Sequence, residues 1–301
     1  MISFILIIIT SLFFSGVIFK TKSLASGRKG PGLLQPMKDI IRLWKKSSVF
    51  SVTTSFIFQI APCIYIASAI MAILMIPLGN NSGFISFDGD FIMFAYILAF
   101  GKFFMIISAL DTGSSFEGMG ASREALYSML AEPAFFISMG SFALFTGHTS
   151  FHSIFSSIHY GSSISYLLCG LVTFVFILIA MIENSRMPID DPRTHLELTM
   201  IHEVMILDNS GFDLGLIMYT ANLKFALYGA IISNFFIGSL PLEWSILIFF
   251  LVQIVFAFLI GLTESFMARF RMGHNPQFIF ILTSLSLLIF FGVLLVLGKF
   301  I

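Results

Sequence analysis

Charge is scarce in this sequence. Lys, Arg, Asp and Glu make up 11% of its 301 residues, whereas soluble domains carry about 25%. Hydrophobic residues make up 57%, and the mean hydropathy is +0.99. This deficit of charge excludes an ordinary soluble domain and places the chain in a lipid bilayer.

Cysteine is also scarce, and no cofactor-binding pattern is complete. Cys63 and Cys169 lie inside apolar runs and form no metal-spaced set, so we expect no zinc, iron–sulfur cluster or disulfide. Gly118-Met119-Gly120 resembles the start of a dinucleotide fingerprint, but no strand precedes it and the third glycine is absent. His202-Glu203 begins like a metalloprotease motif, but position 206 is Ile. We therefore expect no cofactor or metal in this chain, and a redox enzyme acting alone is nearly excluded.

Long apolar runs are plentiful instead. A helix needs about 20 apolar residues to cross the hydrocarbon core of a membrane. Eight segments meet this requirement: 1–19, 49–78, 91–110, 122–147, 164–182, 212–238, 244–264 and 277–299. We predict an all-α, polytopic membrane protein with eight transmembrane helices, in which residues 1–301 form a single integral-membrane domain.

The basic residues predict an orientation. Lys and Arg occur in or beside four connecting segments, and the connections between these segments have none. The positive-inside rule therefore places the basic segments in the cytoplasm and both termini outside. The predicted cytoplasmic loops are 20–48, 111–121 (with Arg123 just after it), 183–211 and 265–276; the bare loops are 79–90, 148–163 and 239–243.

Three ionisable residues inside the predicted spans are candidates for an ion pathway. Lys102 and Lys224 lie near the middle of the third and sixth spans, where charges are costly and mark proton or ion pathways by default. The alternative is a buried lysine–carboxylate pair that only holds helices together. Glu132 precedes Pro133, which removes a helical donor and favours a kink. A carboxylate there is a candidate proton stop, or else a charge at the membrane edge.

Two further carboxylates have simpler interpretations. Ser122 is a good N-cap for the fourth span, which would place Glu124 in the first turn, where the helix dipole favours a negative charge. Glu264 closes the seventh span, and we interpret it as an interface charge.

A polar stretch from Glu183 to Gly211 interrupts the apolar pattern with eight charged residues and two histidines. Asp190 or Asp191 can cap a helix that begins at Pro192. On a helical wheel of the following residues, Glu197 lies on an apolar side, away from His202 and Glu203. Glu197 is therefore the best single candidate for a proton-carrying group. The alternative is a structural pair with an arginine such as Arg186 or Arg123.

These motifs carry a resemblance. The pattern Glu183-x-x-Arg186-x-Pro188-x-Asp190-x-Pro192, followed by Glu197-Leu198, resembles the signature loop of the membrane subunit 1 family of respiratory complex I. Arg28-Lys29-Gly30-Pro31, with Leu33-Leu34-Gln35-Pro36, is similar to that family's first cytoplasmic loop. Gly120-Ala121-x-Arg123, with Glu132 downstream, resembles its arginine loop and channel glutamate. The short first loop, the run from Asp190 to Glu203 and the run from Asp111 to Gly120 resemble more closely the membrane-anchor subunit of energy-converting group 4 nickel–iron hydrogenases, of the hydrogenase-4 and formate hydrogenlyase types.

The resemblance implies a non-catalytic subunit in a prokaryotic plasma (inner) membrane. Such a subunit docks a soluble arm, made of an iron–sulfur subunit and a hydrogenase-like large subunit, and couples its redox reaction to proton or sodium movement through antiporter-like membrane subunits. The iron–sulfur clusters and any nickel–iron centre would belong to the partners. We assign to the proton path Glu132, Glu183, Asp190, Asp191, Glu197, Glu203, Lys102 and Lys224. We assign to docking of the soluble arm Arg28, Lys29, Gln35, Arg123, Arg186 and Arg193. On charge alone, anionic lipid would suit the basic first loop equally well.

Two alternatives stay open. A quinone-site subunit of a complex I-like NADH:quinone oxidoreductase predicts a long, lipid-accessible cavity that reaches the cytoplasmic loops. A stand-alone secondary transporter would favour internal repeats with broken spans in matching halves. Pro62 and Pro133 form no matched pair, so the transporter ranks last.

Overall fold

The computed structural model describes residues 2–158, 163–190, 200–238 and 240–298. Over these residues the regular structure is helical, and no strand forms. Eight helices are long and apolar enough to cross a membrane, which confirms the predicted all-α, eight-span class. They are α1 (Ile2–Ala25), α3 (Phe56–Leu74), α4 (Asp90–Asp111), α5 (Ser115–Thr146), α7 (Ser163–Glu183), α9 (Gly211–Ile237), α10 (Leu242–Phe266) and α11 (Asn275–Val296).

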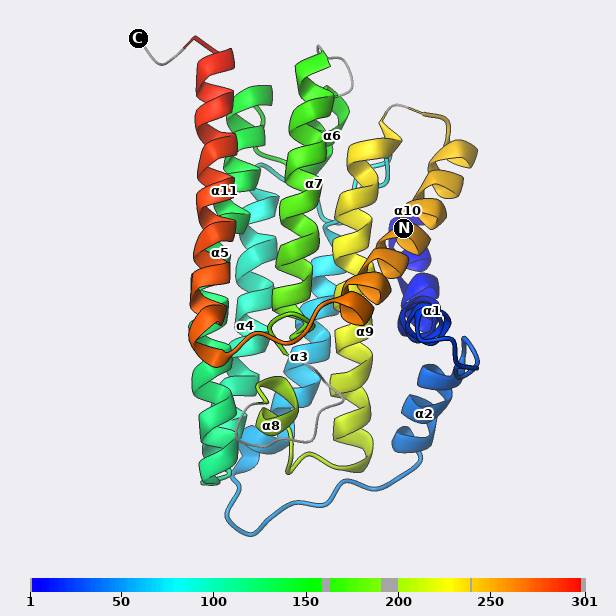
Figure 1. Cartoon of the computed structure of the whole chain (residues 1–301), viewed down its shortest axis with the longest axis vertical. Helices are drawn as coiled ribbons and strands as arrows, with labels where there is room; N and C mark the ends of the chain where they lie inside the picture. The colour runs from blue at the N-terminus through cyan, green and yellow to red at the C-terminus, as the bar shows by residue number, and fades with distance from the viewer. Residues whose placement is uncertain (1, 159–162, 191–199, 239, 299–301) are drawn as a thin grey trace.

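Short helices lie in the connections between the spans. These are α2 (Gln35–Trp44), α6 (Phe151–Ile158), α8 (His202–Met205) and the 3-10 turn η1 (Met272–His274). In Figure 1, α2 and α8 lie at the lower end of the bundle, and α6 lies at the upper end with the last turn of α11. The predicted loop 20–48 therefore contains a helix. Helix α2 is amphipathic, with Ile40 buried and Arg42 exposed.

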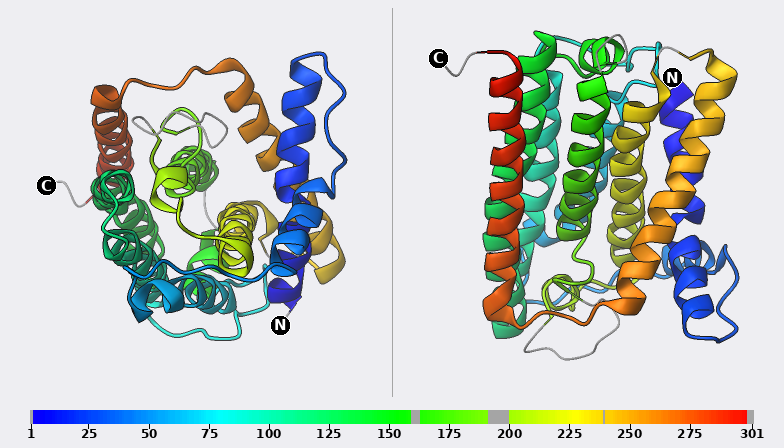
Figure 2. Two further views of the ribbon diagram at one scale, coloured as in Figure 1. Left: turned by 90° about the horizontal axis from the view of Figure 1, so that it is seen from below. Right: turned by 45° about the horizontal axis from the view of Figure 1, so that its top comes forward.

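Helix α9 is the most buried span. In the most apolar 18-residue stretch of this helix, 83% of the residues are buried. The corresponding share in the other spans is 28–50%. It packs against α1, α2, α3, α7 and α10; Figure 2 shows it with α1 and α10 on one side and α4, α5 and α11 on the other. Polar residues of α9 such as Lys224 and Asn234 are therefore surrounded by protein instead of lipid.

Two glycines allow close packing beside the polar loops. A Cβ on Gly261 of α10 would lie 1.6 Å from the Thr21 hydroxyl of α1, so only glycine lets these helices approach here. A Cβ on Gly120 of α5 would lie 2.8 Å from both the Ile201 carbonyl oxygen and the Met205 amide nitrogen. Gly120 thus allows α8 to sit directly on α5.

The predicted start of the fourth span was wrong. Helix α5 begins at Ser115 rather than Ser122 and continues through Pro133 to Thr146. The early turns contain glycine, serine and glutamate, so hydropathy does not detect them. As a consequence, Glu124 lies well inside the helix and not in its first turn.

Candidate functional site: a buried lysine–carboxylate cluster

The centre of the candidate site is Lys102 on α4. Its ammonium lies 3.0 Å from Glu124 Oε1 on α5 and 2.9 Å from Glu183 Oε2 at the end of α7. It also donates a hydrogen bond of 2.7 Å to the Ser128 hydroxyl. Its side chain is 8% exposed. Three partners match the three N–H donors of an ammonium, so Lys102 is fully satisfied without water.

A second lysine approaches the same carboxylate from α9. Lys224 Nζ lies 3.6 Å from Glu183 Oε2, and its side chain is fully buried. Among the described residues it finds no hydrogen-bond acceptor, and its ammonium lies over the Tyr65 ring, with 5.1 Å between Nζ and the ring centroid. With Lys102 and Glu124, the cluster contains two cations and two anions and is electrically balanced.

The turn after α7 connects this cluster to the polar loop. Ser185 has a left-handed backbone with φ of 47°, which is uncommon for a non-glycine residue. Its hydroxyl donates a hydrogen bond of 3.0 Å to Glu124 Oε2. Glu124 therefore accepts one bond from the membrane interior and one from the loop.

A small cavity of about 30 Å³ adjoins the cluster. Its polar lining comes from Lys102, Glu132, Glu183 and Tyr228, and phenylalanines of α4 and α5 form much of the rest. Glu132 makes no ion pair within the described residues. This volume holds one or two water molecules, so Glu132 is placed to contact water rather than a fixed cation.

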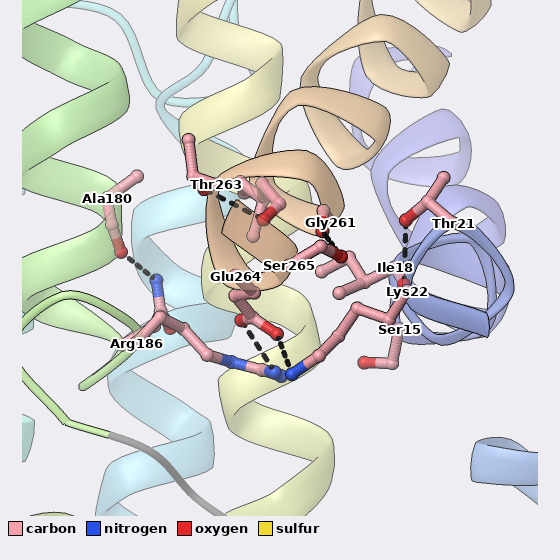
Figure 3. A network of polar contacts seen from close by, with 12 residues as sticks. Ser15, Ile18, Thr21, Lys22, Ala180, Arg186, Gly261, Thr263, Glu264 and Ser265 are labelled. Carbon is pink, nitrogen blue, oxygen red and sulfur yellow. Dashed lines mark hydrogen bonds and ion pairs between the residues drawn. The ribbon is translucent and has the colours of Figure 1, made fainter. Parts of the chain in front are cut away.

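A separate ion network fixes the loop to α1 and α10. Arg186 Nη1 lies 3.2 Å from Glu264 Oε1, and Lys22 Nζ lies 2.8 Å from Glu264 Oε2. In Figure 3 the two cations approach this carboxylate from opposite sides. The Glu264 side chain is fully buried, so the prediction of an interface charge was wrong. Tertiary packing, not the membrane surface, determines its environment.

Asp190 organises the other side of the loop. Its Oδ1 lies 2.9 Å from Arg269 Nη2, and its Oδ2 accepts hydrogen bonds of 3.0 and 3.1 Å from the amides of Ile201 and His202. Asp190 therefore caps α8, whereas the predicted helix start at Pro192 lies outside the described residues. The predicted site residues Asp191, Arg193 and Glu197 lie outside the described residues.

His202 and Glu203 line a different cavity, of about 200 Å³, between α1, α2, α8 and α9. Burial lowers the pKa of the His202 side chain below its usual value. The cations Lys102, Lys224 and Arg186 act in the same direction, while Glu124 opposes them. Neutral imidazole is therefore favoured at this position.

The predicted docking residues have different surroundings. Arg28 and Lys29 are exposed and line an open pocket of about 400 Å³ between the ends of α1 and α10. Gln35 donates a hydrogen bond of 2.9 Å to Asp39. Arg123 donates one of 3.0 Å to the Met200 carbonyl. The Arg186 side chain is 11% exposed and is already paired with Glu264.

Several residues in the site were not assigned to it from the sequence, although Glu124 and Glu264 were considered there in other roles. On α5, positions 124, 128 and 132 are spaced by four and share one helix face, a pattern that lies within the predicted span and could have identified them. Positions 224 and 228 have the same relation on α9. The residues added by the structure are Glu124, Ser128, Ser185, Tyr228 and Glu264. No group of three or more His, Cys, Asp or Glu that could hold a metal occurs in the described ranges.

Sequence comparison identifies the family. A family model described as NADH dehydrogenase matches residues 1–294. The chain belongs to this family. Hydrogenase-4 component C of Escherichia coli (strain K12) is 30% identical over 73% of this chain and 68% of that protein. Formate hydrogenlyase subunit 4 of the same strain is 29% identical over 87% of each. An NADH-quinone oxidoreductase subunit from Flavobacterium johnsoniae is 25% identical over 73% of this chain and 66% of that protein.

Structure comparison confirms the fold. A chain from the membrane-bound sulfane sulfur reductase, an archaeal respiratory membrane complex, superposes with a TM-score of 0.80 and 19% identity, and the match covers 96% of both chains. Together with the eight apolar helices, these relatives confirm the predicted multi-pass protein of the plasma membrane and its resemblance to the hydrogenase-4 and formate hydrogenlyase subunits.

Proposed function

We propose that this chain is a non-catalytic membrane subunit of a respiratory redox complex, which docks a soluble redox arm and couples electron transfer there to proton or sodium translocation. The observation that carries the proposal is the buried cluster of Lys102, Glu124, Glu183 and Lys224 beside Glu132. Ionisable groups at this depth are costly and are characteristic of ion pathways. The loop beside them provides a connection to a partner outside the membrane.

The relatives favour the hydrogenase branch. The chain matches hydrogenase-4 component C and formate hydrogenlyase subunit 4 at 30% and 29% identity, and the NADH-quinone oxidoreductase subunit at 25%. Its partners would then be an iron–sulfur subunit, a hydrogenase-like large subunit and antiporter-like membrane subunits. Iron–sulfur clusters and a nickel–iron centre would lie in those partners.

The proton path is proposed to run from the loop into the spans. Lys102, Glu183, Lys224 and Glu132 form its membrane part. The loop contributes Asp190 and Glu203, with Asp191 and Glu197 assigned from the sequence. The test is Glu132→Gln and Glu197→Gln in the whole complex. Redox turnover and assembly should persist while ion movement per turnover falls, and unchanged coupling in both variants would refute the path.

Docking is proposed for Arg28 and Lys29, because their exposed cations can meet an acidic partner surface, with Gln35, Arg123, Arg186 and Arg193 ordering the adjoining loops. Charge reversal in Arg28→Glu/Lys29→Glu should release the soluble arm during purification. A matched control is Lys38→Glu/Arg42→Glu, the same charge change on α2. Normal co-purification of the arm with the first variant would contradict the docking role.

A quinone site is the second candidate function. The observation in its favour is the cavity of about 200 Å³ that extends from α1 and α9 to Arg186, His202 and Glu203. A mild-detergent pull-down with metal and quinone analysis distinguishes the candidates. Nickel and iron with a large hydrogenase-like subunit support the first, whereas iron and bound quinone without nickel support the second. A chain that purifies alone would favour a transporter.

A further inference from the structure

Tyr228 has no role in the proposed function, yet its position is unusual. It lies four residues after Lys224 on α9, so the two side chains share one face of the most buried span. The tyrosine is 4% exposed, and it lines the 30 Å³ cavity with Lys102, Glu132 and Glu183. Its hydroxyl makes no hydrogen bond to any described residue.

Because Tyr228 lines the cavity, a water molecule there can give its hydroxyl a hydrogen-bond partner. A buried hydroxyl that lacked such a partner would cost about 1–3 kcal/mol. The volume of about 30 Å³ exceeds the 10–15 Å³ or so that a water molecule needs, and a buried water requires two to four polar partners. The cavity provides them in Glu132, Glu183, Lys102 and Tyr228.

The hydrogen bonds that these four groups already make determine which of them can bond to the water. Lys102 has no donor to spare, because Glu124, Glu183 and Ser128 use all three. Water here must therefore bond mainly to carboxylate and phenol oxygens. Among the polar groups that line the cavity, only the phenol and a protonated carboxyl can both donate and accept a proton at the same oxygen.

We propose that the Tyr228 hydroxyl, bridged by water in this cavity, relays protons between Glu132 and Glu183. The proposal rests on the proposed proton path and adds a residue to it. A protonated Glu132 gives its proton to the water, and the water passes a proton to the tyrosine oxygen. The original O–H bond of the tyrosine breaks as its proton moves to the Glu183 carboxylate. The phenol and the water end as they began, Glu132 becomes charged, and Glu183 becomes neutral.

Tyr228→Phe tests the relay because it removes one oxygen and keeps the ring. The assay uses the whole complex reconstituted in liposomes. We expect the variant to retain redox turnover, while the proton-transfer step slows by about 10²-fold. This is the lower end of the rate effect of a single proton-transferring side chain. Tyr127→Phe is the matched control: Tyr127 is also buried, with 6% of its surface exposed, and belongs to the span α5, but it does not line the cavity. That variant should translocate normally.

A second measurement covers the case in which Tyr228→Phe fails to assemble. Incorporation of 3-fluorotyrosine at position 228 keeps the shape and makes the phenol more acidic. A relay predicts a changed pH profile and solvent isotope effect for translocation, whereas a packing role predicts neither. Wild-type translocation in Tyr228→Phe, or an unchanged profile with the fluorinated residue, would overturn the relay. If Glu132→Gln abolishes coupling in the same assay, the proposed function stands without Tyr228; if it too has no effect, the path itself fails.

Discussion

Replacing Lys102 is the most direct test of how the buried cluster is held. Lys102→Met keeps a long, flexible side chain of similar volume, so packing should change little. The variant leaves Glu124 and Glu183 with Lys224 alone, and the cluster changes from balanced to one net negative charge. Removal of one partner from a buried ion pair costs about 3–5 kcal/mol. We expect a loss of that size in the free energy of unfolding.

The assay is a denaturant titration in mixed detergent micelles, with Lys38→Met as the control. Lys38 is exposed on α2, so its replacement should change stability by no more than about 0.5 kcal/mol. The double variant Lys102→Met/Glu124→Gln restores charge balance, because Glu183 and Lys224 remain as a pair. The double variant should recover most of the lost stability, and its free energy of unfolding should stay about 1–3 kcal/mol below that of the wild type. A double variant no more stable than the single one would refute the electrostatic reasoning.

Three further predictions follow from the loop and its orientation. Glu264→Gln should destabilise the protein by about 3–5 kcal/mol in the same titration, because it leaves the buried Arg186 guanidinium without its counter-ion. The pKa of His202 is lowered in the fold from its usual 6.5, so the unfolded chain binds its proton more readily; stability should fall as pH drops below 6.5 and level off below the lowered pKa, and His202→Gln should flatten that part of the profile. In a chain whose two cysteines are replaced by serine, Lys46→Cys should react with an impermeant thiol reagent only from the cytoplasmic side and His148→Cys only from outside; reversed labelling would contradict the orientation.

Hydropathy was sufficient for the spans because a membrane helix is specified by a continuous apolar run. It was less reliable at their ends. The second predicted span, 49–78, contains the helix Phe56–Leu74, and α5 extends seven residues earlier than predicted, to Ser115. Polar turns at helix ends lack the apolar signal. Short amphipathic helices such as α2 and α8 were missed, or misplaced, for the same reason.

The candidate site was only partly visible in the sequence. Lys102 and Lys224 stood out because charge is rare inside spans, and both contact Glu183 as a path or a structural pair would require. Their actual partners depend on how helices pack. Glu264 is 78 residues from Arg186 and 242 from Lys22, and no local pattern brings these three together. A single sequence lacks the distance information that such pairs need.

The turn at the end of α7 connects the buried cluster directly to the polar loop. Glu183 belongs to the cluster, Ser185 donates a hydrogen bond to Glu124, and Arg186 is anchored to Glu264. These three residues lie within four positions of one another, so a displacement of the loop must change at least one of these contacts. Loss of the Ser185 bond would leave Glu124 more dependent on Lys102, which is also the cation of Glu183. A partner that moves this loop therefore has a short physical route to the charges inside the membrane, as the proposed coupling requires.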